Sequence, residues 1–164
     1  METGTWNLQQ AESLIEWRRA KTAISGAKLW GTSGALTTDD IEQGYIGNCW
    51  VLAGASALAE IPSRLEKVFL NTENELNAAG IYAVNFYTLG VPHTVIVDDM
   101  LPLRNWNNGY NTLFAHISDD NAMWMPILEK AFAKYHGNYQ HLIAGNPHIS
   151  ARTLSGAPYE YLMH

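Results

Sequence analysis

The sequence predicts an α+β fold, and three features carry that prediction. Residues 49–60 have the pattern of a helix that is apolar nearly all round, residues 79–90 and 93–103 are rich in Val, Ile, Tyr and Phe, and residues 124–135 form a second helical pattern. Helices that bracket a small antiparallel sheet give this fold class. With 164 residues and no internal repeat or linker, the chain fits one domain with a sizeable core.

The N-terminal part is predicted to be a helix followed by a loop. Residues 8–24 place apolar side chains near helical spacing, at Leu14, Ile15 and Trp17, and contain no breaker. Residues 25–40 contain three glycines and end in a run of Thr and Asp, which is typical of a loop.

The helix over 49–60 is expected in the middle of the domain, because a helix without a polar face is normally buried. Pro62 should end it, since Pro is not tolerated inside a helix. A short second helix is then expected over 63–70, with Ser63 as its N-cap.

The two segments rich in β-branched and aromatic residues predict a β-hairpin. The few residues that join them include a Gly and a Pro, as is common in turns. Asp98 and Asp99 are expected to be turn-forming or capping residues at the end of a strand. Residues 105–111 predict a turn-rich loop, and residues 112–116 a further short strand.

The clearest helix is predicted over residues 124–135. Its apolar stripe consists of Trp124, Ile127, Leu128, Ala131, Phe132 and Tyr135. Its opposite side is expected to carry Glu129, Lys130 and Lys134. Pro126 must fall in the first turn, and Gly137 follows where a C-terminal cap is expected. Short helices and loops should complete the chain.

Composition narrows the functional classes. The net charge of -6 with only ten Lys and Arg argues against nucleic-acid binding. A single cysteine excludes an internal disulfide framework and favours a reducing, cytoplasmic or other intracellular compartment. No apolar run approaches the roughly 18 residues of a membrane span, and the N-terminus lacks the pattern of a signal peptide.

The single cysteine, Cys49, has two interpretations: an inert buried thiol, or a nucleophile. Its predicted position at a helix start favours the thiolate, because unpaired N–H groups and the helix dipole stabilise negative charge there. Gly44 and Gly47 form a bend that a substrate backbone could approach closely. Gln43 could join the Cys49 N–H in an oxyanion hole. Trp50 is a candidate substrate contact, although its place in an apolar helix favours core packing.

The segment QGYIGNCW, residues 43–50, resembles the nucleophile motif of the calpain family, Gln-Gly-x-x-Gly-Asp/Asn-Cys-Trp. Three more segments resemble motifs of this branch of the papain-like cysteine proteases: VIVDDMLPL (95–103), WMPILEKAFAKYHGNY (124–139) and IEWRR (15–19). The resemblance therefore extends over residues 15–164. It implies the N-terminal, nucleophile-bearing half of a papain-like catalytic core, preceded by an extension over residues 1–14.

The resemblance also implies a mechanism and partners. Cys49 would attack a peptide bond of a protein substrate, Gln43 would hold the oxyanion, and a histidine and an asparagine on a second lobe of the parent protein would complete the site. None of the chain's six histidines matches the family's histidine motif; they are His93, His116, His136, His141, His148 and His164. The chain alone is therefore expected to be inactive. The alternative is a catalytically silent homologue that acts as a protein-binding or scaffold module.

Calcium dependence is a further implication of the resemblance. Asp40 matches the family's aspartate ligand, three residues before the Gln of the nucleophile motif. Ala122 stands where the family has a glutamate ligand, and losing a carboxylate should weaken a hard oxygen site. Asp119 or Asp120 could substitute from nearby.

Overall fold

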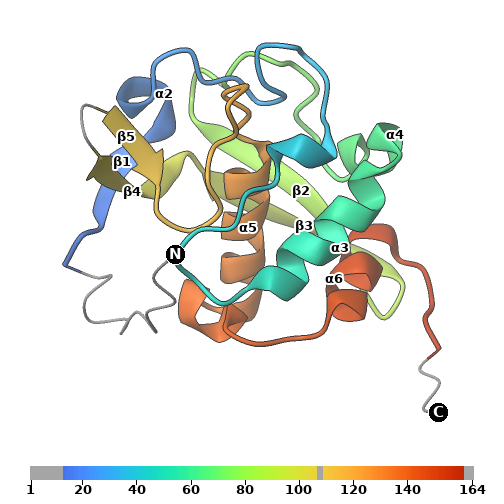
Figure 1. The fold of residues 1–164 in the computed structure, drawn as a ribbon. Helices are drawn as coiled ribbons and strands as arrows, with labels where there is room; N and C mark the ends of the chain where they lie inside the picture. Colours follow the sequence, from blue (N-terminus) through green and yellow to red (C-terminus); the bar gives the residue numbers. More distant parts are fainter. Residues whose placement is uncertain (1–12, 107–108, 161–164) are drawn as a thin grey trace.

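The computed structural model describes residues 13–106 and 109–160, and within them the fold is α+β, as the sequence predicts. The elements in chain order are β1 (Glu16–Arg19), α2 (Ala20–Ala23), η1 (Thr38–Asp40), α3 (Cys49–Ala59), α4 (Pro62–Glu66), β2 (Ile81–Thr88), β3 (Val91–Asp98), β4 (Met100–Trp106), β5 (Gly109–Thr112), α5 (Trp124–His136), η2 (Tyr139–Leu142) and α6 (Pro147–Ser155). Helix α5 runs through the centre of the molecule, with β1, β4 and β5 on one side of it and α3 and α6 on the other (Figure 1).

The predicted hairpin is confirmed as β2 and β3. The two strands pair in antiparallel register from Ile81 opposite Asp98 to Thr88 opposite Val91. Alternate residues of β2 are buried, as expected for a strand with one face on the core. The turn requires the left-handed backbone region, which Gly90 adopts at φ 82° without steric cost.

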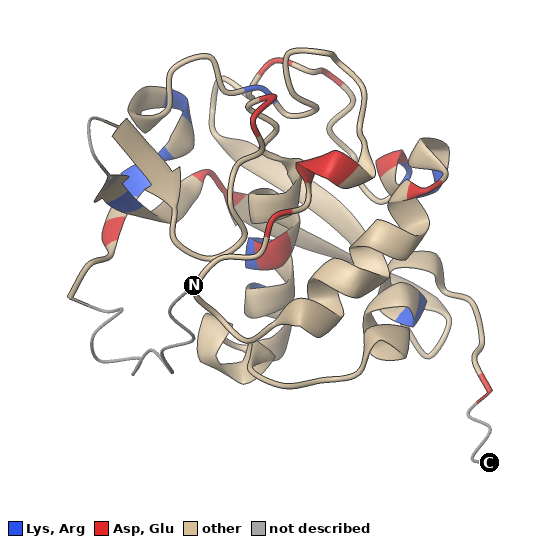
Figure 2. Ribbon diagram, viewed as in Figure 1, with Lys and Arg blue, Asp and Glu red and all other residues tan. Residues whose placement is uncertain are grey.

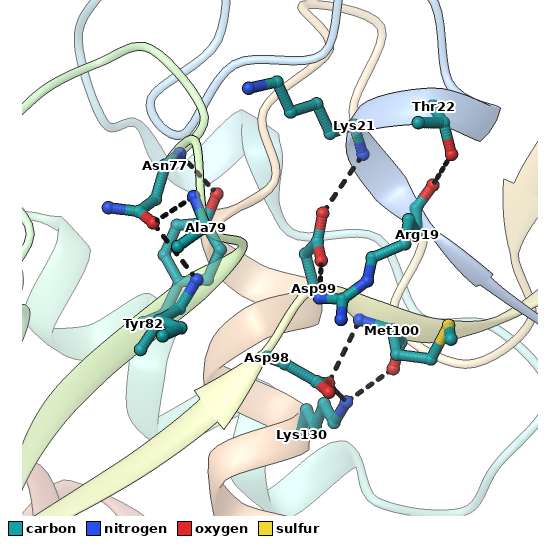
Figure 3. A network of polar contacts seen from close by, with 11 residues as sticks. Arg19, Lys21, Thr22, Asn77, Ala79, Tyr82, Asp98, Asp99, Met100 and Lys130 are labelled. Carbon is teal, nitrogen blue, oxygen red and sulfur yellow. Dashed lines mark hydrogen bonds and ion pairs between the residues drawn. The ribbon is translucent and has the colours of Figure 1, made fainter.

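Asp98 and Asp99 lie at the end of a strand, as predicted, and they divide residues 93–103 between two sheets. Strand β3 ends at Asp98, and β4 begins at Met100 in a second antiparallel sheet with strand order β1-β4-β5. The Asp98 carboxylate accepts a hydrogen bond from the Met100 N–H at 3.1 Å, which forms the turn (Figure 3). Lys130 of α5 donates to both Asp98 and the Met100 carbonyl, so the break is fixed against the central helix.

The helix predicted over 8–24 is largely wrong within the described residues, where only Ala20–Ala23 are helical. Residues 16–19 form strand β1, which pairs with β4 from Glu16 opposite Leu103 to Arg19 opposite Met100, and the helix α2 that follows has four residues. The Arg19 guanidinium donates to the buried Asp99 carboxylate at 2.7 Å, fastening this strand to the β3–β4 junction (Figure 3). Tertiary pairing with a distant strand has overridden a local helical pattern. Residues 8–12 lie outside the described part.

Helix α3 packs on α6 and has seven of its eleven residues buried. It is not buried on every side as predicted, because Cys49, Ala53 and Ala57 are exposed along one face. It carries no Lys, Arg, Asp or Glu, so its ribbon is tan throughout in Figure 2. The two helices approach closely at Gly54, where an added Cβ would lie 2.4 Å from Ser150 Oγ. The predicted Ser63 cap is wrong: α4 begins with Pro62 as its first residue and Ile61 at the N-cap, because Pro is favoured at the first helical position.

Helix α5 has the predicted stripe, with Pro126 in its first turn and Gly137 at its C-cap at φ 104°. One prediction for this helix fails: Glu129 is 2% exposed and does not lie on the polar side with Lys130 and Lys134. In the first turns of α5, residues 124–129 are buried on every side.

The strand predicted over 112–116 is largely wrong. Strand β5 ends at Thr112, and the loop predicted over 105–111 instead contains the ends of the paired strands β4 and β5. Residues 113–115 are irregular. The Leu113 N–H still donates to the Pro102 carbonyl of β4 at 2.8 Å, but the Leu113 carbonyl accepts from the Tyr45 N–H and the Ala115 N–H donates to Glu129. No helix within the described ranges is long and apolar enough to cross a membrane.

Candidate active site around Cys49

Cys49 is the first residue of α3, and its thiol-bearing side chain is exposed. A tight turn precedes it: the Asn48 N–H donates to the Ile46 carbonyl at 2.9 Å, and the Asn48 carbonyl accepts from the Val51 N–H at 2.8 Å. Among the described residues, the Cys49 N–H has no recorded acceptor, as expected in the first turn of a helix. An exposed thiol beside a free N–H at the positive end of a helix can act as a nucleophile.

The Gln43 side chain is exposed and bends back along this turn. Its Nε2 donates to the Ile46 carbonyl at 3.0 Å. An amide nitrogen has two hydrogens, so one donor remains for another acceptor. A local contact therefore holds the Gln43 amide against the turn that precedes Cys49.

The two glycines of the turn, Gly44 and Gly47, have different surroundings. At Gly44 an added Cβ would lie 1.8 Å from the Phe114 carbonyl oxygen, so this glycine permits the turn to pack on residues 113–114. At Gly47 the nearest atom to an added Cβ would be Ile143 Cγ2 at 3.8 Å, which leaves ordinary space there. Only Gly47 has the open surroundings that approach by a substrate backbone requires.

A buried carboxyl group lies behind the cysteine turn. Glu129 Oε1 accepts from Asn48 Nδ2 at 2.6 Å, and the two Glu129 oxygens accept from the Ala115 N–H at 3.0 and 3.1 Å. Burial raises the pKa of Glu129 to about 7, although the hydrogen bonds from Ala115 and Asn48 act in the opposite direction. Helix α5, the loop before it and the start of α3 therefore meet at one titratable group.

Trp50 is a core residue in this structure, 3% exposed. Its indole Nε1 donates to the Leu142 carbonyl at 2.7 Å, and its ring packs edge-on against His136 with centroids 5.6 Å apart. An added Cβ at Gly145 would lie 2.5 Å from the indole ring. These contacts hold the first turn of α3 against the core, so packing explains the burial of Trp50 without a substrate contact.

No hydrogen bond or ion pair recorded within residues 13–106 and 109–160 joins a histidine to Cys49. The histidines in those ranges are His93, His116, His136, His141 and His148. His116 Nδ1 lies 3.3 Å from Glu42 Oε1, and burial lowers the pKa of His136. His164 lies outside the described residues.

Asp40 is buried and bonded to N–H groups. Its Oδ2 accepts from the Thr37 N–H and from the Trp124 indole, each at 2.9 Å. Ala122, at the position of the family's glutamate, is fully buried and offers no side-chain oxygen. Asp40 thus anchors the first residue of α5, and one carboxylate falls short of the oxygen set that calcium prefers.

Asp120 is also engaged with protein donors. Its carboxylate accepts from the Ser33 Oγ at 2.7 Å and from the Ser33 N–H and the Thr32 hydroxyl. Hydrogen bonds from Thr32 and Ser33 lower the pKa of Asp120. Asp119 is exposed. In the part of the chain that the structure describes, no group of three or more His, Cys, Asp or Glu is placed to hold a metal ion.

Sequence reasoning missed Glu129 and its partners. The signal was the spacing: Glu129 lies four residues after Met125 and three before Phe132, and all three are buried on α5. At that spacing residues share a helical face. The role of the Ala115 N–H had no sequence signal, because any residue carries a backbone donor.

Known proteins similar to this chain form one group. The sequence profile of calpain family cysteine proteases matches residues 4–164. The chain is 34% identical over 154 residues to a calpain of Schistosoma mansoni, covering 92% of this chain and 20% of that protein. It is 34% identical over 139 residues to Calpain-5 of Mus musculus, covering 80% and 21%, and 38% identical over 113 residues to the calpain-type cysteine protease DEK1 of Zea mays, covering 69% and 5%. The chain thus spans about a fifth or less of these relatives' lengths.

Proposed function

Because this chain belongs to the calpain family of cysteine proteases, we propose that it carries the nucleophile of an enzyme that hydrolyses peptide bonds in protein substrates. The observation that supports this most is the exposed Cys49 thiol at the start of the uncharged helix α3. The thiolate form of this side chain is the attacking species in the proposal.

In this proposal the thiolate of Cys49 attacks the scissile carbonyl carbon. The oxygen of the tetrahedral intermediate then takes hydrogen bonds from the Cys49 N–H and from Gln43 Nε2. Collapse of the intermediate expels the amine and leaves an acyl-enzyme, which water hydrolyses. The leaving amine requires a proton from a general acid.

We propose that this acid and base is a histidine, oriented by an asparagine, in another lobe of the full-length protein. The support is the resemblance to the family, together with the lack of any recorded bond between Cys49 and a histidine in the described ranges. The 164-residue chain alone would then be inactive towards peptides. The same proposal places the protein inside the cell, since its single cysteine suits a reducing compartment.

A silent binding or scaffold module is the second candidate; it requires no catalytic histidine, and no recorded hydrogen bond or ion pair of His93, His116, His136 or His141 involves Cys49. The two candidates differ in the thiol. A protease lobe should hold Cys49 as an accessible thiolate, whereas a silent homologue has no such requirement.

Alkylation of the chain with iodoacetamide across pH 5 to 10, followed by mass spectrometry, tests this. The protease proposal expects a midpoint clearly below the value of about 8.5 for a free thiol. The Cys49→Ser variant is the control for alkylation elsewhere. A midpoint at or above about 8.5 would count against a nucleophile prepared by this lobe.

Calcium dependence stays a prediction of the resemblance. Asp40 is the one residue of the family's carboxylate pair that this chain retains, and both recorded hydrogen bonds to it come from N–H donors. The residues present therefore do not fit a hard oxygen site. Titration calorimetry tests it: heat at millimolar calcium that disappears in Asp40→Asn would support a site, and absence of heat would remove Asp40 as a ligand.

A further inference from the structure

The Asn48 amide and the Glu129 carboxyl group form a buried contact directly behind the cysteine. The two residues are 81 positions apart in the sequence, 0% and 2% exposed, and joined by a hydrogen bond of 2.6 Å. Asn48 precedes Cys49, and Glu129 lies in the middle of the central helix α5. The contact therefore links the central helix of the fold to the residue beside the thiol.

Asn48 does not use its side chain in the ordinary way. An asparagine at an N-cap usually accepts a hydrogen bond from an N–H of the first turn. Here Asn48 is the N-cap of α3 and makes no such bond; it donates to Glu129 instead. The partner on α5, rather than capping, sets the orientation of this side chain.

Few groups face Glu129. The Ala115 N–H donates to both of its oxygens, and no Lys or Arg in the described ranges is recorded in an ion pair with it. The half-buried Tyr139 of η2 lies close enough for the charges of Glu129 and Asp98 to act on it, and burial of its hydroxyl is the main cause of its raised pKa. Lys130, the next residue on α5, is bonded to Asp98 instead.

We infer that Glu129 is a positioning residue for Cys49: its carboxyl group holds the Asn48 amide and thereby fixes the backbone at the start of α3, from which the thiol projects. The inference rests on the proposed role of Cys49 as a nucleophile. Glu129 touches no substrate in this scheme and acts only through Asn48. Misplacement of a reacting group by about 1 Å can cost about a hundredfold in rate, which gives such a contact its importance.

Protonation should change this contact. An ionised carboxylate only accepts hydrogen bonds, whereas a protonated one must also place an O–H donor. Burial brings the pKa of Glu129 to about 7, so both forms are populated near neutral pH. The reactivity of Cys49 should therefore carry a second pH-dependent step besides the ionisation of its own thiol.

The test is the rate of Cys49 alkylation in the 164-residue chain, measured from pH 5 to 10 and divided by the thiolate fraction. Three variants are compared with the wild type. Glu129→Gln keeps the shape of the side chain but does not titrate, and Asn48→Ser keeps a favoured N-cap residue that is too short to reach α5. The third variant combines both substitutions. Glu66→Gln removes an exposed carboxylate on α4 and is the matched control. Circular dichroism and urea unfolding select conditions in which every variant is folded.

We expect a step near pH 7 in the wild-type chain and in Glu66→Gln, and its loss in Glu129→Gln. Each single variant at the contact should alter the rate by about threefold to tenfold, the range for one hydrogen bond, and the double variant should add nothing further. A reactive Cys49 whose profile is unchanged in Glu129→Gln, or additive effects in the double variant, would overturn this inference alone. A wild-type thiol no more reactive than a free thiol would overturn the proposed function, and this inference with it.

Discussion

The buried Glu129 predicts how the stability of this protein depends on pH. Its pKa is about 7 in the folded protein, against the ordinary value of 4.5, because burial penalises the ionised form. A group that binds its proton more tightly when folded stabilises the protein fully below its unfolded pKa. That contribution falls as pH rises from about 4.5 and is gone above about 7.

The size of this contribution to stability follows from the folded and unfolded pKa values of Glu129. A gap between about 7 and 4.5, at about 1.36 kcal/mol per pKa unit, corresponds to about 3 kcal/mol of unfolding free energy. Glu129→Gln has no such term, since an amide does not titrate. The unfolding free energy of the variant minus that of the wild type should therefore rise by about 3 kcal/mol between pH 4.5 and 7.5.

Urea unfolding followed by tryptophan fluorescence, at intervals of half a pH unit, measures this difference. All other titrating groups cancel in the subtraction, provided they do not interact with Glu129. Glu66→Gln, which changes an exposed carboxylate, should give a nearly flat difference. A difference that stays constant with pH for Glu129→Gln would refute a raised pKa of the Glu129 carboxyl group in the folded protein. A difference that falls with pH would mean that the fold instead holds Glu129 ionised.

Two further predictions concern the cysteine turn. Gly44→Ala should lower the unfolding free energy by about 1 to 3 kcal/mol, because the new Cβ would lie 1.8 Å from the Phe114 carbonyl oxygen. Gly47→Ala should change it by less than about 0.5 kcal/mol, because the nearest atom to the new Cβ lies 3.8 Å away. Equal losses for the two variants in urea unfolding would contradict this prediction. Trp50→Phe should cost about 1 to 2 kcal/mol in the same assay, since the buried Leu142 carbonyl loses its donor, and a neutral result would mean that this bond adds no stability.

Features with a strong local pattern could be predicted from the sequence. The β2–β3 hairpin and helix α5 are present, because apolar residues repeat at the period of each element, and helix α3 is present over a segment that is apolar nearly all round. The place of Cys49 at a helix start follows from the same local signal. The strand β1 could not be predicted this way, since its hydrogen bonds go to β4, about 80 positions further along the chain.

The sequence by itself determined the family, the fold class and the position of the thiol at a helix start. Only the tertiary structure decided what lies behind that thiol: Asn48 turned away from its cap towards Glu129, and Asp40 bonded to the Trp124 indole. The physical reason is that burial and hydrogen bonding of a polar side chain depend on which distant elements pack against it. Glu129, beside Lys130, therefore resembled a solvent-exposed residue in the sequence, and it became a buried acceptor for the Asn48 amide once α3 and α5 had packed.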